Sequence, residues 1–203
     1  AVGGPGVTPP GDGFLARLGG RVYDNPLVSG NYRYRYKAGG IRREVDDYPS
    51  CNLLVRRSLL EQFGGYRTDF WPGEDTLLCK DIMDSGNRIV YDPWVIVFHH
   101  RRPLFGPHLR QLGRYGFHRG YFVKRYPSNS LHFTYFVPSM FVVYLALLAI
   151  LLCALPVVAN FCGGWLAANM PIVAGAFVLP LALYLTLVLA TTISMNPAVW
   201  LLT

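Results

Sequence analysis

Two adjacent carboxylates, Glu74 and Asp75, directly follow the segment Trp71-Pro72-Gly73. An aromatic residue, a proline and a glycine in a row are typical of a loop, and the apolar residues that follow at helical spacing predict a helix from about 74 to 85. Acidic side chains at a helix start complement the positive end of the helix dipole, which is the structural interpretation. A carboxylate at a loop-to-helix junction can also take a proton from a bound hydroxyl, which makes Asp75 and Glu74 candidate catalytic residues.

Two histidines and two arginines, His99-His100-Arg101-Arg102, end the last expected strand. A neutral imidazole can bind a divalent cation, and nearby guanidinium groups can hold phosphate. Adjacent strand residues point to opposite sides, so only one histidine can face a given site. The segment therefore indicates either a cation and phosphate site or an ordinary basic surface cluster. A metal-dependent hydrolase built on His99, His100 and Asp75 would lack a third closely spaced ligand motif.

A basic segment from about Pro107 predicts a helix in which Gln111 and Arg114, three residues apart, share one face. An amide and a guanidinium on one face suit the binding of a diphosphate. The same segment also carries apolar residues that favour an amphipathic helix lying among lipid headgroups: Leu112, Tyr115, Phe117, Tyr121 and Phe122. The two interpretations use opposite faces of the helix and are compatible.

Strands and helices are expected to alternate along the part of the chain that contains these residues. We expect strands at 51–55, 88–91 and 95–99, a helix at 59–63 capped by Ser58 and ended by Gly64-Gly65, and a helix at 74–85. Residues 1–50 are rich in glycine, proline and aromatic residues, and they predict loops with one short strand. This mixed order indicates an α/β sheet, of which the chain would form only a part.

All 19 lysines and arginines and all 12 acidic residues precede Tyr126, so residues 126–203 carry no formal charge. Two uncharged stretches, 136–158 and 171–193, match the ~20 residues that cross a bilayer, and a short turn is expected between them at 159–170. Lys124 and Arg125 precede the first stretch, which predicts a multi-pass membrane protein with residues 1–126 in the cytoplasm. The alternative is a hairpin buried in a soluble core, whose helices normally carry a polar stripe.

The cysteines and the chain ends add two further expectations. The four cysteines show no C-x-x-C spacing, which excludes a metal knuckle and predicts free thiols in a reducing compartment: Cys51, Cys79, Cys153 and Cys162. The sequence starts at Ala1 and stops within an apolar run, so we expect it to be a fragment of a longer protein.

The order of these motifs resembles the acceptor half of a family 2 glycosyltransferase of the GT-A fold, over about residues 1–126. The resemblance rests on Cys51 to Arg57, Phe63-Gly64-Gly65-Tyr66, Asp69 to Cys79, Tyr91-Asp92-Pro93 and Val97-Phe98-His99-His100. Its most specific part is the run from Phe63 to Cys79. Gln111-Leu112-Gly113-Arg114-Tyr115 is similar to the Gln-x-x-Arg-Trp motif of membrane-bound members, with Tyr115 in place of the tryptophan.

The resemblance implies inverting transfer of a sugar from a nucleotide diphosphate sugar to a lipid-linked or polysaccharide acceptor. Asp75 would be the general base, with Glu74 beside it. The resemblance supports a donor-diphosphate role for Gln111 and Arg114, and a weaker one for His99 as a metal ligand. The further candidates for substrate binding are Arg101, Arg102, Trp71 and Gly73.

The family's nucleotide-binding half, with its Asp-x-Asp site, would precede Gly3-Gly4-Pro5, and this sequence contains no Asp-x-Asp. The main ligands of a divalent cation, Mg²⁺ or Mn²⁺, are expected in that half. The 203 residues alone are therefore expected to be inactive.

Taken together, the sequence predicts a partial GT-A domain of the α/β class at 1–105, a basic interfacial helix at 106–126, and a membrane region at 127–203. Membrane lipids are expected partners, and nucleic acid is not. The alternative from another class is a non-catalytic membrane protein whose basic segment binds anionic lipid or a partner.

Overall fold

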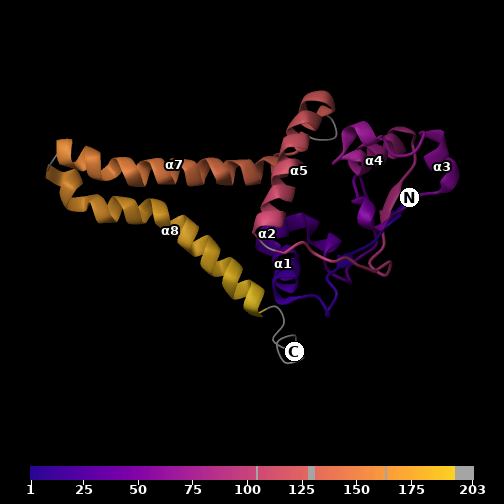
Figure 1. The fold of residues 1–203 in the computed structure, drawn as a ribbon, viewed down its shortest axis with the longest axis horizontal. Coiled ribbons are helices and arrows are strands. Elements are labelled where there is room, and N and C mark those ends of the chain that lie inside the picture. Colours follow the sequence, from indigo (N-terminus) through magenta and orange to yellow (C-terminus); the bar gives the residue numbers. More distant parts are fainter. Residues whose placement is uncertain (104, 128–130, 163, 195–203) are drawn as a thin grey trace. The chain divides into compact units, whose positions relative to one another are not determined.

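The computed structural model describes residues 1–103, 105–127, 131–162 and 164–194. The chain divides into two compact units, Ala1–Ser130 and Leu131–Thr203. The first unit is a mixture of short strands and helices and holds all the predicted site residues (Figure 1). The second unit consists of two long apolar helices.

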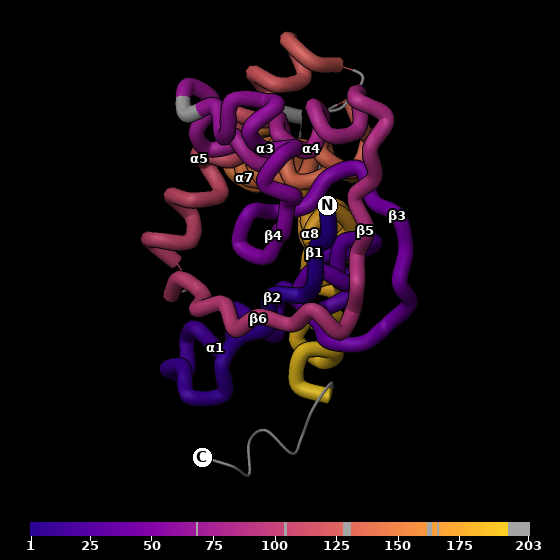
Figure 2. The backbone as a smooth tube through the Cα atoms, turned by 90° about the vertical axis from the view of Figure 1, so that its right-hand side faces the viewer, coloured from indigo at the N-terminus to yellow at the C-terminus, as the bar shows by residue number. Residues whose placement is uncertain are grey.

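The strands of the first unit form a four-stranded sheet in the order β3-β5-β1-β4, which Figure 2 shows from right to left. These strands are β1 (Val2–Gly3), β3 (Arg43–Val45), β4 (Leu53–Leu54) and β5 (Ile89–Tyr91). β1 is parallel to β5, whereas β4 and β3 are antiparallel to their neighbours. A separate parallel pair joins β2 (Gly6–Val7) to β6 (Val97–Phe98). The start of the chain thus lies beside the segment that leads into His99.

Helices of the first unit lie between these strands and after them. They are α1 (Phe14–Asp24), α2 (Pro26–Ser29), the 3-10 helices η1 (Gly30–Arg35), η2 (Ser50–Asn52) and η3 (Thr68–Phe70), α3 (Arg57–Gln62), α4 (Glu74–Asp84) and α5 (Gly106–Arg125). One buried cluster joins α4 to the sheet through Leu78, Cys79, Ile82, Ile89 and Tyr91. Burial of these apolar side chains fixes α4, and with it the position of its first turn.

The expectation of loops and one short strand for residues 1–50 is wrong in part. The segment contains α1, and the tyrosines at 32 and 34 lie in η1 rather than in a strand. Gly19 and Gly20 weaken the helical signal, because glycine costs about 1 kcal/mol relative to alanine in a helix interior. The fold requires the second of them, since a Cβ on Gly20 would lie 2.1 Å from Oγ1 of Thr8. Close packing therefore selects a residue that local propensity disfavours.

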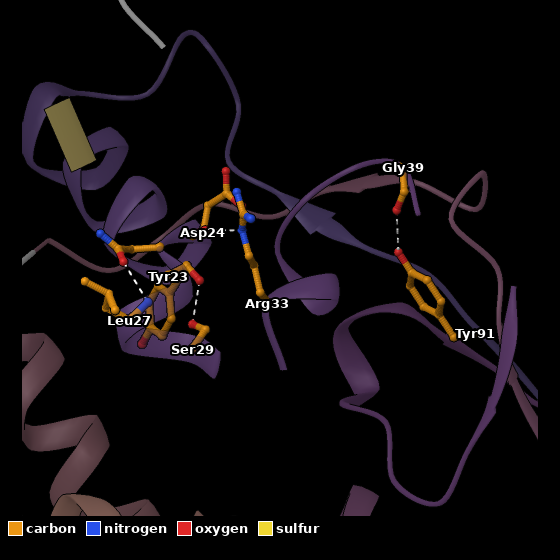
Figure 3. Close-up of polar contacts among 8 residues, drawn as sticks. Tyr23, Asp24, Leu27, Ser29, Arg33, Gly39 and Tyr91 are labelled. Carbon is orange, nitrogen blue, oxygen red and sulfur yellow. Dashed lines mark hydrogen bonds and ion pairs between the residues drawn. The ribbon is translucent and has the colours of Figure 1, made fainter. Parts of the chain in front are cut away.

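Polar contacts hold the segment between α1 and β3 in place (Figure 3). Asn25 caps α2 by accepting a hydrogen bond from Leu27 N, and Ser29 Oγ donates to the carbonyl of Tyr23. Arg33 pairs with Asp24, and Tyr91 Oη donates to the carbonyl of Gly39. The first three contacts join residues close in sequence, and the fourth joins the segment to β5. Together they hold the segment in place although it contains no long strand.

Smaller differences concern the strand expected at 51–55 and the helix after it. Only Leu53–Leu54 is strand, because η2 precedes it and places the buried Asn52 so that its Nδ2 donates to the carbonyls of Gly4 and Val95, each at 2.7 Å. Ser58 is not the cap of α3: the N-cap is Arg56, and no side chain caps this helix. The predicted glycine stop at 64–65 is confirmed, because both glycines have positive φ.

The second unit contains α7 (Phe133–Cys162) and α8 (Gly164–Ser194), which contact each other. Tyr144 Oη donates to the carbonyl of Phe177 at 2.7 Å, and the rings of Phe141 and Tyr184 lie 5.8 Å apart. Both helices are long and apolar enough to cross a membrane by length and composition. Few of their described side chains are buried, unlike those of a core helix in a soluble protein.

The prediction of a turn over residues 159–170 is wrong, because α7 extends to residue 162 and α8 begins at residue 164. Residue 163 lies outside the described residues. The polar residues of this stretch do not interrupt the helices. Asn169, for example, directs its Nδ2 to the carbonyl of Trp165, one turn earlier in α8. Gly164, with φ of +56°, shows the left-handed backbone that a change of chain direction requires.

Candidate active site

The two adjacent carboxylates bind different backbone groups. Gly73 donates its N–H to Glu74 Oε2 at 3.0 Å, so Glu74 folds back over the loop that precedes α4. Asp75 instead accepts from Thr76 N through Oδ1 at 2.8 Å and from Ser50 N through Oδ2 at 3.1 Å. Both side chains are half-buried. Asp75 therefore has a fixed carboxylate between α4 and η2 that is still accessible to a ligand.

The loop before α4 has a backbone that only glycine adopts readily. Gly73 has φ of +137°, and a Cβ built there would lie 2.5 Å from Cε2 of Phe122 in α5. Phe122, which the amphipathic interpretation places among lipid headgroups, is instead buried in a small cluster with Phe70 and Leu77, because its ring packs against Gly73. The end of α5 is thus packed directly against the loop that carries the carboxylates.

Arg114 and Gln111, the two residues of α5 predicted to bind diphosphate, make contacts with different parts of the protein. The Arg114 guanidinium lies over the Trp71 ring, with Cζ 5.8 Å from the ring centroid, so the structure brings it to the Trp71-Pro72-Gly73 loop. Gln111 donates from Nε2 to Tyr115 Oη at 2.7 Å, so its amide is turned along its own helix. Gln111 and Tyr115 therefore share one face of α5, so the expectation that the diphosphate residues and the lipid-facing aromatic residues use opposite faces is wrong for this pair.

His99 follows β6 and has a pKa below the ordinary value, because burial and then the positive charges of Arg101 and His100 disfavour its protonation. Its imidazole is therefore neutral near pH 7, as a metal ligand must be. Among the described residues, however, no three His, Cys, Asp or Glu side chains cluster to hold a metal ion. The described residues thus do not form a complete cation site, and a role of His99 as a metal ligand stays a prediction.

Arg101 has extensive contacts within the protein. Its guanidinium donates to the carbonyl of Gly6 and to Thr8 Oγ1, and it lies 5.4 Å and 5.1 Å from the ring centroids of Tyr23 and Tyr36. Burial raises the pKa of Tyr23 to about 12, so this tyrosine stays neutral. These contacts attach the end of β6 to the first residues of the chain. A role of Arg101 or of the exposed Arg102 in binding diphosphate stays a prediction.

Several residues beside Asp75 were not among the sequence-based candidates. Asp47 is buried, and burial raises its pKa, although the charges of Arg35 and Arg119 work in the opposite direction. The charge of Asp75 also raises this pKa, which shows that the two carboxylates are close enough to interact. Arg35 is likewise buried among tyrosines. One weak signal for Asp47 is present in the sequence, the Asp46-Asp47 pair immediately before Tyr48.

A shallow surface groove of about 710 Å³ lies in the same unit but contains none of the predicted site residues. Its lining includes Tyr32, Tyr34, Arg43, Glu44 and Asp46. One face of Tyr34 is already covered by the Arg43 guanidinium, 3.8 Å from the ring centroid. The groove thus gives no support to the predicted roles, although Tyr32 in its lining contacts Arg35.

Comparisons with known proteins give one distant similarity. Pre-mycofactocin glycosyltransferases from two strains of Mycobacterium tuberculosis, CDC 1551 / Oshkosh and ATCC 25618 / H37Rv, are each 27% identical to this chain over 86 residues. The match covers 42% of this chain and only 18% of each relative's length. No family model matches the sequence, and no solved structure matches it. The similarity supports a relationship between this chain and glycosyltransferases.

Proposed function

We propose that this chain is the acceptor-side part of an inverting family 2 glycosyltransferase of the GT-A fold. In this proposal the parent enzyme is a multi-pass membrane protein that transfers a sugar from a nucleotide diphosphate sugar to a lipid-linked or polysaccharide acceptor at the cytoplasmic membrane face. The observation that carries the proposal is the fixed, half-buried carboxylate of Asp75 beside the loop over which Arg114 lies. The distant similarity to glycosyltransferases supports the same class.

The proposed reaction is an in-line displacement at the anomeric carbon. Asp75 takes the proton of the acceptor hydroxyl as its oxygen attacks, and the nucleoside diphosphate leaves from the opposite face. Negative charge grows on the leaving diphosphate, so a guanidinium such as Arg114 stabilises the transition state more than the ground state. Trp71 and Gly73 would shape the acceptor side of this site. Gln111 would have to exchange its bond to Tyr115 for one to the donor.

A divalent cation would supply further charge neutralisation at the diphosphate. His99 fits one ligand position because its imidazole is neutral, but the nearby Arg101 charge opposes a cation there. We therefore propose that the main ligands of Mg²⁺ or Mn²⁺ belong to another part of the parent protein, and that Arg101 and Arg102 contact phosphate. None of the steps assigned to Asp75 and Arg114 depends on the cation being held by this chain.

The acceptor is the broadest part of the proposal. The matched relatives are named for pre-mycofactocin, so an acceptor panel should include that compound beside lipid-linked sugars and glycans. The chain matches only 18% of the relatives' length, so the assay must use the full-length parent protein in membranes. Transfer of labelled sugar from a set of nucleotide diphosphate sugars into each acceptor defines the activity.

The decisive variant is Asp75→Asn in that full-length protein. Asn keeps the shape of the side chain but cannot take a proton, so turnover should fall by ~10² to 10⁴ while affinity for the nucleotide sugar is retained. If Asp75 has only a structural role, Asn keeps one of its two backbone hydrogen bonds through the amide oxygen and loses the other, so the change should cost about 1 kcal/mol of stability and leave turnover intact.

Glu74→Gln is the matched control, because Glu74 binds the neighbouring N–H of Gly73 rather than facing Ser50. This variant should keep most of the parental turnover. An Asp75→Asn enzyme as fast as the parent would rule out the proposed mechanism.

A second candidate, a non-catalytic membrane protein, is favoured by one observation on α5. This helix carries exposed apolar residues, including Leu109 and Phe117, together with the bases Arg110, Lys124 and Arg125. Such a helix suits binding to anionic lipid. If sugar transfer is measured and depends on Asp75, lipid binding alone is excluded as the function of the protein.

A further inference from the structure

Residues 47–50 run along one face of α4, and backbone groups make the contacts. Asp75 and Cys79 are four residues apart and therefore lie on the same face of the helix. Tyr48 N lies 3.4 Å from Cys79 Sγ, and the same sulfur lies 3.5 Å from the Tyr48 carbonyl oxygen. Ser50 N donates to Asp75 Oδ2 at 3.1 Å. The segment is thus attached to α4 at two successive turns.

Asp47, at the first position of this segment, is bound by the largely buried side chain of Arg35. Its Nη2 donates to the carbonyl of Asp47 at 2.7 Å and lies 3.7 Å from the Asp47 carboxylate. The guanidinium also lies 4.7 Å from the ring centroid of Tyr32 and 5.6 Å from that of Tyr48. Both charged side chains are largely buried, with 14% and 9% of their surface exposed. Side chains so enclosed leave the backbone of 47–50 little freedom to move.

The two bonds to Asp75 have a specific consequence for its carboxylate. Thr76 N and Ser50 N bind different oxygens and belong to different elements, so together they fix the rotation of the carboxylate group. An ionised carboxylate has about four acceptor positions, so two backbone donors leave others for an acceptor hydroxyl. Loss of the Ser50 bond would allow the group to rotate about its remaining contact within α4.

We infer that the backbone amide of Ser50 positions Asp75 for proton transfer, and that Arg35 holds this amide in place by binding the Asp47 carbonyl. The inference rests on the proposed role of Asp75 as the base. Ser50 and Arg35 are positioning residues in this arrangement, because they act through Asp75 and touch no substrate.

Ser50→Pro tests the inference, because proline has no N–H and places a ring carbon where the Ser50 hydrogen lies. The backbone should accept it: Ser50 begins a 3-10 helix, whose φ suits proline, and Pro49 before it is extended with ψ of 141°. Misplacing a catalytic group by about 1 Å can cost ~10², so kcat of the full-length protein should fall by about 10- to 100-fold, with the KM for the nucleotide sugar little changed.

Ser50→Ala is the matched control, since it removes the hydroxyl but keeps the N–H, and it should retain parental kcat. Equal kcat in the two Ser50 variants would overturn the inference. Arg35→Lys keeps the charge but not the planar fork. It should lower kcat less than Arg35→Ala, because its ammonium group can still donate to the Asp47 carbonyl, again with little change in KM; a parental kcat in Arg35→Ala would contradict a role for Arg35 in holding the segment.

A second measurement needs no activity. Hydrogen exchange at the Ser50 amide, followed by NMR on the full-length protein in detergent micelles, should accelerate by about tenfold or more in Asp75→Ala, because the acceptor of its bond is gone. Unchanged exchange would refute the positioning contact itself. If exchange accelerates but Asp75→Asn keeps parental turnover, the proposed function fails while the contact stands. The two failures are therefore distinguishable.

Discussion

At the scale of single residues, Glu74 and Asp75 are neighbours with separate tasks. Successive residues of a helix point about 100° apart, so two adjacent carboxylates cannot both approach one hydroxyl equally well. Glu74 satisfies the N–H of Gly73, one of the donors that a helix start leaves unpaired, whereas Asp75 reaches across to η2. The structural interpretation of the acidic pair thus fits Glu74, and the proposed catalytic role fits Asp75.

Arg114 allows a second test at this scale. If its guanidinium binds the donor diphosphate, Arg114→Ala in the full-length protein should reduce turnover by on the order of 10² in detergent, because an interaction with the transition-state charge is lost. Arg110→Ala is the control, since it removes a base one turn earlier on the same exposed part of α5. Similar small losses in both variants would indicate that Arg114 serves only as a lipid contact.

Asp47 should give stability a recognisable pH dependence. Burial raises its pKa above the ordinary 3.8, so the native chain keeps this proton to higher pH than the unfolded chain does. The contribution of Asp47 to the free energy of unfolding is therefore greatest at pH values near and below its ordinary pKa. This contribution declines as the pH rises through the native pKa, by at most about 1.4 kcal/mol per pH unit.

Asp47→Asn should remove that decline, although it also costs a pH-independent amount because Arg35 loses its carboxylate partner. Thermal unfolding of the full-length protein in detergent tests this expectation when parent and variant are compared between about pH 4 and 7. This range covers the pH values above the ordinary carboxyl pKa of about 4, where the decline is expected. The exposed neighbour Asp46 provides the control variant, Asp46→Asn. Parallel curves for parent and Asp47→Asn would contradict the expectation.

At the scale of elements, α5 and the loop before α4 form one packed arrangement. Phe122 occupies the space above Gly73, and Arg114, two turns earlier, lies over Trp71. A helix that carries both contacts cannot shift without moving the loop that leads into Glu74 and Asp75. The positions of the basic helix and of the carboxylates are therefore coupled by contact within this unit.

Gly73→Ala should disrupt this coupling. A Cβ would meet Phe122 at 2.5 Å, and φ of +137° is strained for any L-residue, so we expect destabilisation of about 2 kcal/mol or more. The unfolding temperature of the full-length protein in detergent should fall accordingly. Gly64→Ala is the control, because Gly64 also has positive φ but open space around its Cβ position. Equal losses in the two variants would show that backbone strain, and not Phe122, limits position 73.

At the scale of the whole molecule, the chain combines a charged α/β unit with a unit that has no formal charge. The described helices of the second unit expose large apolar side chains along their length, including Val142, Leu147, Ile150, Leu185 and Leu189. Water does not solvate such a surface well, whereas lipid does. This composition and length are what support a membrane location for the chain.

The proposed topology places residues 1–126 in the cytoplasm, because Lys124 and Arg125 are the last charged residues before α7. A cysteine introduced as Asn160→Cys, in a background without the four native cysteines, should then react with an impermeant maleimide added to intact cells. Arg110→Cys should react only after the cells are opened. The reverse labelling pattern would reverse the orientation.

Features that depend on local spacing and composition could be predicted from the amino-acid sequence. The helix at Glu74, its end near Gly86, and the two long apolar helices follow from periodicity, glycine and the absence of charge, and all three are present in the structure. These signals are local, so no knowledge of distant contacts is needed to detect them. The glycosyltransferase relationship, predicted from motif order, is supported by a distant similarity over 42% of the chain.

Which distant residues meet could not be predicted, because contacts between distant segments form only in the folded chain. α1 was missed because Gly20 lowers helix propensity, and the close approach of Thr8 that requires a glycine there cannot be seen in a local pattern. The same holds for the site: Ser50 contributes a backbone N–H, which every residue but proline possesses, so nothing in its side chain marks it. Asp47 and Arg35 are distinguished by burial alone, and burial is a property of the folded chain.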